Sequence, residues 1–247
     1  MVQTDAPPSN EFAIESKGLR KQFGLIEALR GVEFRLRAGE FLTIFGPNGA
    51  GKTTLLGILS SLTRPTAGQA RVAGYDVTDH DPRMRREIGV ISHASFLYPD
   101  LTALENLVFY ARLYGLADPE AVALRGLEEV ELSLRRHDKV GTFSRGMVQR
   151  VSIARAMIHN PSILFLDEPY TGLDQHASLL LERHLKELKT EKRTVVMTTH
   201  DFGRGLEMAD RVAIQVKGRF AKFLDRADAG DAAAFERLYI DTVEGVL

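Results

Sequence analysis

The chain has 247 residues, of which 44% are apolar, and this composition is sufficient to bury the core of one large α/β domain. Its formal net charge is −1, so it lacks the basic surplus that is typical of proteins that bind nucleic acid. The absence of cysteine excludes disulfides and thiolate metal sites.

The first part of the chain predicts a lead-in followed by strands. Residues 1–12 are polar and contain proline, and we expect a disordered segment without the apolar core of a signal peptide. From Ile14 to about residue 45, and again over residues 69–77, polar and apolar positions alternate. This alternation predicts strands that form an antiparallel layer with one face toward the core.

The segment GPNGAGKT, residues 46–53, fits the pattern G-x-x-x-x-G-K-[ST] completely. Residues 41–45 before it predict a buried strand, and residues 54–62 after it predict a helix with one apolar face. In such a turn, backbone N–H groups hold phosphate oxygens, Lys52 neutralises the β- and γ-phosphates, and the Thr53 hydroxyl binds Mg²⁺. We therefore predict an ATP-type triphosphate site formed by Gly46, Pro47, Asn48, Gly49, Ala50, Gly51, Lys52, Thr53 and Thr54.

The middle of the chain is rich in helical periodicity. Leucine, valine and alanine recur at helical spacing from residue 101 to about residue 160. Ser144 is a natural N-cap for a helix that continues to about Ile158, and the first N–H groups of that helix could face an anion.

Two later strands are followed by polar residues. Residues 163–166 form an apolar strand followed by Asp167 and Glu168. Ligands of parallel sheets lie at the carboxyl ends of the strands, so Asp167 is placed to hold Mg²⁺ and Glu168 to orient or deprotonate water. An acidic turn without a function is the alternative. Residues 194–199 predict another core strand, and His200 after it is predicted to contact the γ-phosphate, the alternative being a structural histidine.

The end of the chain completes the predicted organisation. Residues 212–216 predict a further core strand, and residues 232–240 predict a short amphipathic helix that packs on its own domain. We expect residues 223–247 to form a short C-terminal extension.

The octapeptide FSRGMVQR, residues 143–150, points to one family. It resembles the signature sequence of ABC-type ATPases, L-S-G-G-Q followed by x-Q-R. The serine, the second glycine and the final Gln-Arg match, whereas Arg145 and Met147 replace the first glycine and the glutamine. The resemblance extends from about Ile14 to Lys222, with the motifs in the family's order.

This resemblance implies an α/β fold with a phosphate-loop (RecA-like) core sheet, an antiparallel β layer and an inserted helical lobe. The ATPase domain would span residues 13–222 and the lobe about residues 94–160. Phe23 would contact the adenine ring, unless it is a core residue. His93 would replace the usual glutamine that contacts Mg²⁺ and water. The remaining implied ATP-binding residues are Ser144, Arg145 and Gly146 of the signature and Asp174 of the loop TGLD.

The resemblance also implies partners. The signature of one subunit would complete the ATP site of the other, which predicts a head-to-tail homodimer, with a second ATPase chain as the alternative. No apolar run approaches the ~18 residues of a membrane-spanning helix. We therefore expect a peripheral protein on the cytoplasmic face of the inner (cell) membrane, bound to an integral membrane transporter subunit near Phe96–Pro99.

The cargo implied by the resemblance is haem. Residues 92–116, together with His93 and the motif PYTGLD, are similar to the ATPase of the haem exporter of cytochrome c maturation. ATPases of drug and polysaccharide exporters share these details, and a soluble ATPase of iron–sulfur assembly shares the fold. A DNA-repair ATPase of the superfamily would need a long coiled coil between Lys52 and Ser144, and no sustained heptads occur there.

Overall fold

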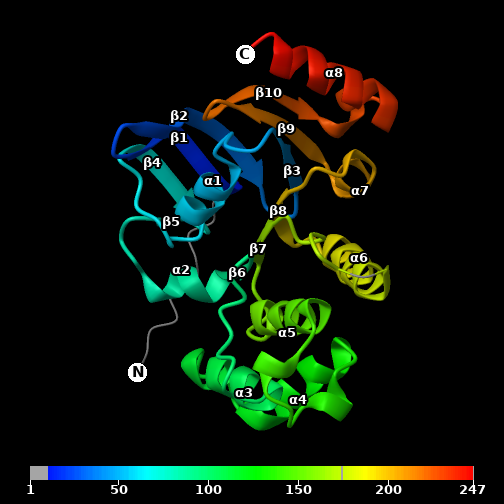
Figure 1. The fold of residues 1–247 in the computed structure, drawn as a ribbon. Coiled ribbons are helices and arrows are strands. Elements are labelled where there is room, and N and C mark those ends of the chain that lie inside the picture. Colours follow the sequence, from blue (N-terminus) through cyan, green and yellow to red (C-terminus); the bar gives the residue numbers. More distant parts are fainter. Residues whose placement is uncertain (1–10, 174, 247) are drawn as a thin grey trace.

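The computed structural model describes residues 11–173 and 175–246, which form two β-sheets and a lobe of helices (Figure 1). The smaller sheet is antiparallel, with strand order β2-β1-β4-β5. Its strands are β1 (Phe12–Phe23), β2 (Ile26–Arg37), β4 (Ala67–Val72) and β5 (Tyr75–Asp76). Buried and exposed residues alternate along the second half of β2, because one face of the sheet packs on the core. The predicted antiparallel layer is confirmed.

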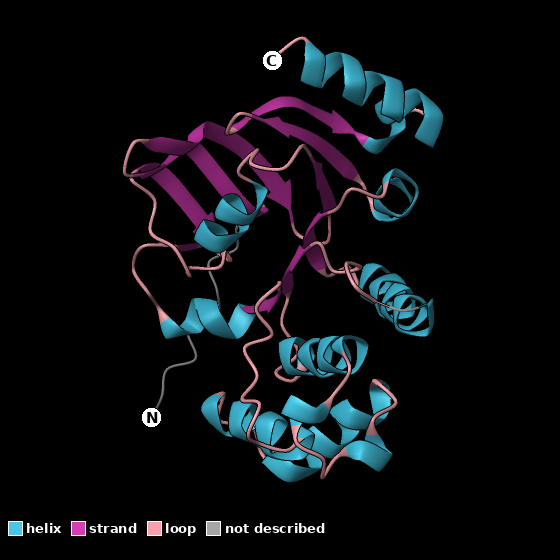
Figure 2. Ribbon diagram, in the orientation of Figure 1, coloured by secondary structure: helices cyan, strands magenta, loops and turns pink. Residues whose placement is uncertain are grey.

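The larger sheet has strand order β10-β9-β3-β8-β7-β6, and its neighbouring strands are parallel except at β10 (Figure 2). These strands are β3 (Phe41–Phe45), β6 (Ile88–Ile91), β7 (Ile163–Asp167), β8 (Thr194–Thr198), β9 (Arg211–Val216) and β10 (Arg219–Asp225). Every residue of β3, β7 and β8 is buried, as expected for central strands that are covered on both faces. The predicted phosphate-loop core sheet is confirmed.

Strand β3 lies in the middle of the larger sheet. Its Leu42 pairs with Val196 of β8 on one side and with Arg211 of β9 on the other. The expectation that the antiparallel layer extends to about residue 45 is therefore wrong for this strand, whose burial does not alternate. The sequence also does not predict β6 and β10, and the expected boundary at residue 222 lies inside β10.

Helices surround the sheets and form a separate lobe. Along the sheets lie α1 (Lys52–Leu59), α2 (Pro82–Glu87), α6 (Gln175–Thr190) and α7 (Phe202–Met208). The lobe contains α3 (Ala103–Leu113), α4 (Pro119–Glu129) and α5 (Arg145–Met157). It lies at the opposite end of the molecule from the C-terminal helix α8 (Ala232–Glu244) (Figure 1). Short 3₁₀ turns occupy Ser133–Arg135, Val140–Thr142 and Arg226–Ala229.

Each helix of the lobe begins at a capping side chain. Thr102 and Glu105 form a reciprocal capping box at α3, and the Asp118 side chain accepts from the Ala121 N–H at α4. At α5 the Ser144 Oγ accepts from the Met147 N–H at 3.3 Å, which confirms Ser144 as the N-cap. The start of α5 is therefore fixed by local chemistry.

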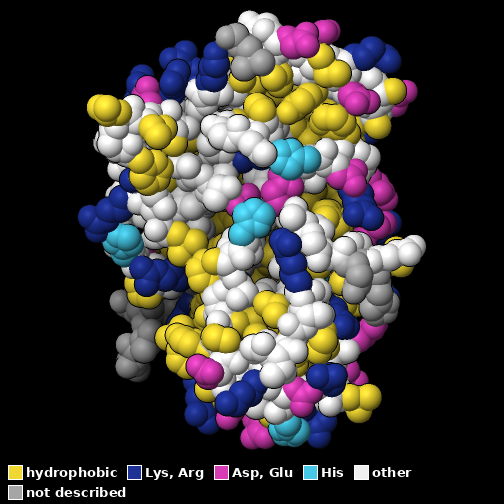
Figure 3. All heavy atoms as spheres, in the orientation of Figure 1, with side chains coloured by type: hydrophobic (Ala, Val, Ile, Leu, Met, Phe, Trp, Pro, Cys, Tyr) yellow, Lys and Arg dark blue, Asp and Glu magenta, His cyan; other side chains and the backbone are white. Residues whose placement is uncertain are grey.

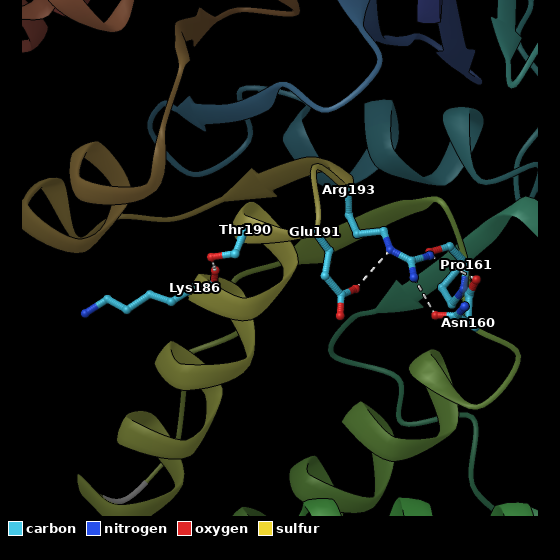
Figure 4. A network of polar contacts seen from close by, with 6 residues as sticks. All are labelled: Asn160, Pro161, Lys186, Thr190, Glu191 and Arg193. Atoms are coloured by element: carbon cyan, nitrogen blue, oxygen red, sulfur yellow. Dashed lines mark hydrogen bonds and ion pairs between the residues drawn. The ribbon is translucent and has the colours of Figure 1, made fainter.

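A polar network joins the starting ends of β7 and β8 (Figure 4). Arg193, just before β8, donates to the Pro161 carbonyl and to the Asn160 side chain, both at 2.6 Å, and pairs with Glu191 at 3.2 Å. On the neighbouring helix end, the Thr190 hydroxyl donates to a backbone carbonyl of α6 at 3.0 Å. The Arg193 contacts therefore link the segments that precede β7 and β8, two strands that pair in parallel.

The C-terminal helix α8 (Ala232–Glu244) packs on the domain itself, as predicted, and extends beyond residue 240. Its Phe235 is fully buried, with its ring 4.8 Å from that of Phe45 and 5.6 Å from that of Phe202. This aromatic cluster supports the end of β3, directly before the glycine-rich turn.

Candidate active site

A cavity of about 510 Å³ lies where β3 and β7 end. On the face drawn in Figure 3, acidic and histidine side chains gather in a hollow near the centre. The walls of the cavity come from the glycine-rich turn, the tip of the β1–β2 hairpin and the ends of core strands. Its lining residues are Phe23, Ile26, Glu27, Ala28, Pro47, Asn48, Gly49, Ala50, Gly51, Lys52, Thr53, Thr54, His93, Asp167, Glu168, Thr171 and His200. It is therefore placed where parallel sheets bind ligands.

The glycine-rich turn between β3 and α1 packs closely against the backbone of Gln215 and Ala28. A Cβ atom on Gly46 would lie 2.2 Å from the Gln215 carbonyl oxygen, and one on Gly51 would lie 2.4 Å from that of Ala28. Gly51 also has a φ of +99°, which L side chains rarely adopt. Only glycine fits these positions, so the turn keeps the N–H groups of the α1 start open to the cavity.

Lys52 is the cation of the cavity and is only 7% exposed. Its Nζ donates to the carbonyl oxygens of Gly46 at 2.5 Å and Pro47 at 3.3 Å. Burial lowers the pKa of Lys52, and the nearby charges of Glu168 and Asp167 raise it. A buried ammonium held by weak neutral acceptors is suited to bind an incoming phosphate.

Asp167 is the last residue of β7, and among the described residues only one of its two carboxylate oxygens accepts a hydrogen bond. Its Oδ1 accepts from the Thr198 hydroxyl at 2.7 Å, whereas its buried Oδ2 has no hydrogen-bond partner among the described residues. A buried carboxylate oxygen without a donor is costly unless a cation or water meets it. This donor set fits Mg²⁺ or a water bound to it.

Glu168 follows in a backbone conformation with a φ of +51°, uncommon for a residue with a side chain. Its N–H donates to the Thr198 carbonyl at 3.1 Å and to the Thr198 Oγ1 at 3.0 Å. Its Oε1 lies 3.0 Å from the Nε2 of His200. The structure therefore brings Lys52, Asp167, Glu168 and His200 together around one cavity, as the sequence predicts.

Two other predicted residues line the same cavity. Phe23 is 51% exposed at the end of β1, so the alternative of a core side chain is wrong. The Nζ of Lys21 lies 4.6 Å from the centre of the Phe23 ring. His93, in the segment after β6, is exposed toward the cavity, which places an imidazole among the carboxylates.

The signature residues are not part of this cavity. Ser144, Arg145 and Gly146 open α5 on the lobe, and none of them is among the lining residues. A Cβ atom on Gly172 would lie 2.3 Å from the Arg145 Nε, so the Arg145 side chain lies across the loop that follows Glu168. The predicted residue Asp174 lies outside the described residues.

Sequence reasoning missed several residues at the site. Thr198 connects Asp167 and Glu168 and is fully buried at the end of β8. Ile26, Glu27 and Ala28 form one wall of the cavity, and Thr171 is also part of the lining. The only signal for Thr198 was a hydroxyl at the end of a predicted core strand, adjacent to the strand that carries the carboxylates.

This geometry defines a phosphate-loop ATPase with an inserted helical lobe. The family model for the ABC transporter matches residues 29–171. The chain is 32% identical to the linearmycin resistance ATP-binding protein LnrL of Bacillus subtilis over 235 residues, which cover 94% of this chain and 76% of that protein. It is 38% identical to the Nod factor export ATP-binding protein I of Burkholderia thailandensis over 208 residues, which cover 83% and 68%.

Solved structures give the same result. A dimeric post-hydrolysis state of the ATP-binding cassette MJ0796 bound to ADP and Pi is 31% identical, with a TM-score of 0.79 over 86% of this chain and 98% of that one. An ATP-binding subunit of an ABC transporter is 29% identical, with a TM-score of 0.84 over 93% and 99%. This chain belongs to the ABC transporter family, as an ATP-binding subunit. It is an ABC-type ATPase and binds ATP.

Proposed function

We propose that this chain is the ATP-hydrolysing subunit of an exporter and acts with a separate integral membrane subunit at the cytoplasmic face of the cell membrane. The observation that carries the proposal is the convergence of Lys52, Asp167, Glu168 and His200 on the cavity beside the glycine-rich turn. Among residues 11–173 and 175–246, no helix combines the length and apolar character needed to cross a membrane. The transport pathway would therefore come from another chain.

Different residues of the cavity would bind the metal, activate the water and contact the adenine. Thr53 and Asp167 would hold Mg²⁺, with His93 as a further contact, and the unpaired Asp167 Oδ2 supports this assignment. When bound, Mg²⁺ neutralises the phosphate charge that develops during transfer. Glu168 would accept a proton from the attacking water, while His200 holds its carboxylate and reaches the γ-phosphate. Phe23 would stack on the adenine.

A complete site would need two copies of the chain. Ser144, Arg145 and Gly146 lie outside the cavity of their own chain, yet α5 presents free N–H groups that suit a phosphate. A head-to-tail homodimer would bring them onto the ATP of the partner, with Asp174 at the interface. The related dimeric cassette bound to ADP and Pi supports this arrangement.

The cargo is the least constrained part of the proposal. Two of the relatives compared above are named for linearmycin resistance and Nod factor export, which favours the drug-exporter alternative, or a Nod-factor-type cargo, over haem. Haem export, and with it cytochrome c biogenesis, stays a prediction from sequence resemblance without support from these relatives. A soluble iron–sulfur assembly ATPase is the alternative that needs no membrane subunit.

Affinity purification of the tagged full chain from membranes of its native host tests the proposal. We expect one integral membrane protein to co-purify in a stable ratio, and ATP turnover of the complex to differ from that of the isolated chain. The Lys52→Ala variant is the matched control, because it should retain the membrane partner but lose turnover. Recovery of an active chain without any membrane protein would favour the soluble alternative.

His93 provides a separate prediction. If the imidazole of His93 replaces a glutamine carbonyl near the metal, His93→Gln should retain ATP turnover within about threefold. His93→Ala should lower turnover about tenfold or more, the scale for losing a side chain that supports a metal site. Steady-state ATPase assays at saturating Mg²⁺-ATP measure this. Equal activity of His93→Ala and the unchanged protein would remove His93 from the site.

A further inference from the structure

Two segments of the core meet at Glu168 and His200. The first is the turn that follows β7, residues 168–173, and the second is α7 together with the residue pair before it, His200 and Asp201. The segments touch in the cavity, where the Glu168 Oε1 lies 3.0 Å from the His200 Nε2. They touch again outside the cavity lining, where the Arg204 guanidinium lies 4.8 Å from the ring centre of Tyr170. The function proposed above assigns no role to this second contact.

Tyr170 belongs to the same turn as Glu168. The Thr171 N–H donates to the Glu168 carbonyl at 3.0 Å, and the Leu173 N–H donates to the Tyr170 carbonyl at 3.2 Å. Glu168 has a φ of +51°, a backbone conformation that persists only where surrounding contacts hold it. Because the two turns overlap, a displacement of Tyr170 would also move the backbone of Glu168.

Arg204 is fixed to the second segment. Its N–H donates to the Asp201 side chain at 3.0 Å, which caps α7, and its Nε lies 3.7 Å from the same carboxylate. Asp201 directly follows His200, and the Asp201 N–H donates to the Thr199 hydroxyl at 3.1 Å. The position of Arg204 is therefore coupled, over four residues, to the position of the His200 imidazole.

The contact between the segments depends on the face of the Tyr170 ring and not on its hydroxyl. The hydroxyl is buried and has no hydrogen-bond partner among the described residues. Burial raises the pKa of Tyr170 to about 12, so this side chain carries no charge near pH 7. A guanidinium 4.8 Å from a ring centre lies within the range of a cation–π contact. Phenylalanine should therefore replace Tyr170 without loss of the contact.

We propose that Tyr170 and Arg204 are positioning residues for ATP hydrolysis, because their contact sets the distance between the Glu168 carboxylate and the His200 imidazole. This inference rests on the proposed function, in which Glu168 accepts a proton from the attacking water. Neither Tyr170 nor Arg204 is among the lining residues of the ATP cavity. Misplacement of a catalytic group by about 1 Å can cost ~10²-fold in rate, so the contact acts on turnover and not on ATP binding.

Steady-state ATPase kinetics of single variants test this role. Tyr170→Leu and Arg204→Gln should each lower kcat about tenfold, while the KM for ATP stays within about twofold of its original value. Tyr170→Phe should retain kcat, and Arg204→Lys should recover part of it, because the ring face and the positive charge are kept. The matched control is Tyr75→Leu, which removes a ring 5.3 Å from the Arg83 guanidinium, outside the cavity lining, and should leave kcat unchanged.

Double variants distinguish positioning from a general loss of stability. Tyr170→Leu combined with Arg204→Gln should be no slower than either single variant, because both changes remove the same contact. In a Glu168→Gln background, Tyr170→Leu should lower the residual single-turnover rate less than about twofold, since the carboxylate that it positions is absent. A purely structural role would lower that rate by the same factor as in the unchanged protein. The Arg204 side chain is 40% exposed, so Arg204→Gln keeps the test valid even if Tyr170→Leu does not fold.

The outcomes separate this inference from the proposed function. Near-normal kcat in Tyr170→Leu and Arg204→Gln, or an equal loss in Tyr170→Phe and Tyr170→Leu, overturns the positioning contact and leaves the proposed function intact. An undiminished effect of Tyr170→Leu in the Glu168→Gln background overturns it as well. If Glu168→Gln alone retains near-normal turnover, the proposed role of Glu168 fails, and this inference fails with it.

Discussion

Glu168→Gln is expected to abolish most ATP turnover while ATP binding persists. Glutamine preserves the size of the side chain and a hydrogen-bonding partner for His200, which lies 3.0 Å from the Glu168 carboxylate, but it cannot accept a proton from water. Turnover should fall by ~10²–10⁴-fold, the usual contribution of a general base. Binding of ATP should stay near normal, because Lys52 and the glycine-rich turn are unchanged.

Single-turnover hydrolysis, equilibrium binding of a fluorescent ATP analogue and size-exclusion chromatography with ATP measure these effects. The variant should accumulate as an ATP-bound dimer, since hydrolysis can no longer release the two halves. Glu27→Gln is the matched control: Glu27 lines the same cavity but pairs with Arg20 at 3.1 Å on the β1–β2 hairpin. Near-normal turnover in Glu168→Gln would remove this residue from the chemistry.

Lys52→Ala and Ser144→Arg are each expected to be inactive alone and to recover activity when mixed. Lys52 lies in the ATP cavity, whereas Ser144 lies outside it on the lobe, so a head-to-tail heterodimer would contain one site with both halves intact. With random pairing in a two-fold symmetric dimer, about a quarter of all sites would be intact. ATPase activity of an equimolar mixture, measured against each variant alone, reports this recovery.

Thr142→Arg is the control for the added charge, because Thr142 is exposed two residues before Ser144 and does not cap the helix. Circular dichroism should show that Ser144→Arg remains folded despite a lost N-cap, which costs about 1 kcal/mol of stability. Full activity of Ser144→Arg alone would contradict the composite site. No recovery in a mixture that demonstrably forms heterodimers would indicate that both sites of the dimer must be functional.

Features that depend on neighbouring residues along the chain are predictable from the amino-acid sequence alone. The spacing of Gly46, Gly51 and Lys52 predicts the phosphate turn, because the positive φ of Gly51 and the absence of Cβ atoms are properties of the local backbone. Ser144 predicts the start of α5 for a similar reason, since an N-cap bonds to an N–H three residues away. Continuous apolar runs predict β7 and β8, together with the polar residues at their ends.

The order of the strands in each sheet and the contacts between distant side chains are seen only in the folded protein. Leu42 pairs with Val196 across more than half of the chain, and the apolar run of β3 predicts a buried strand without indicating which strands lie beside it. Thr198 connects Asp167 to Glu168 because β7 and β8 are adjacent and in register. The rings of Phe96 and Tyr110 that surround the Arg155 guanidinium come from separate segments, so this contact exists only after folding. Pairing and burial between distant segments depend on the whole core, and a single sequence does not record them locally.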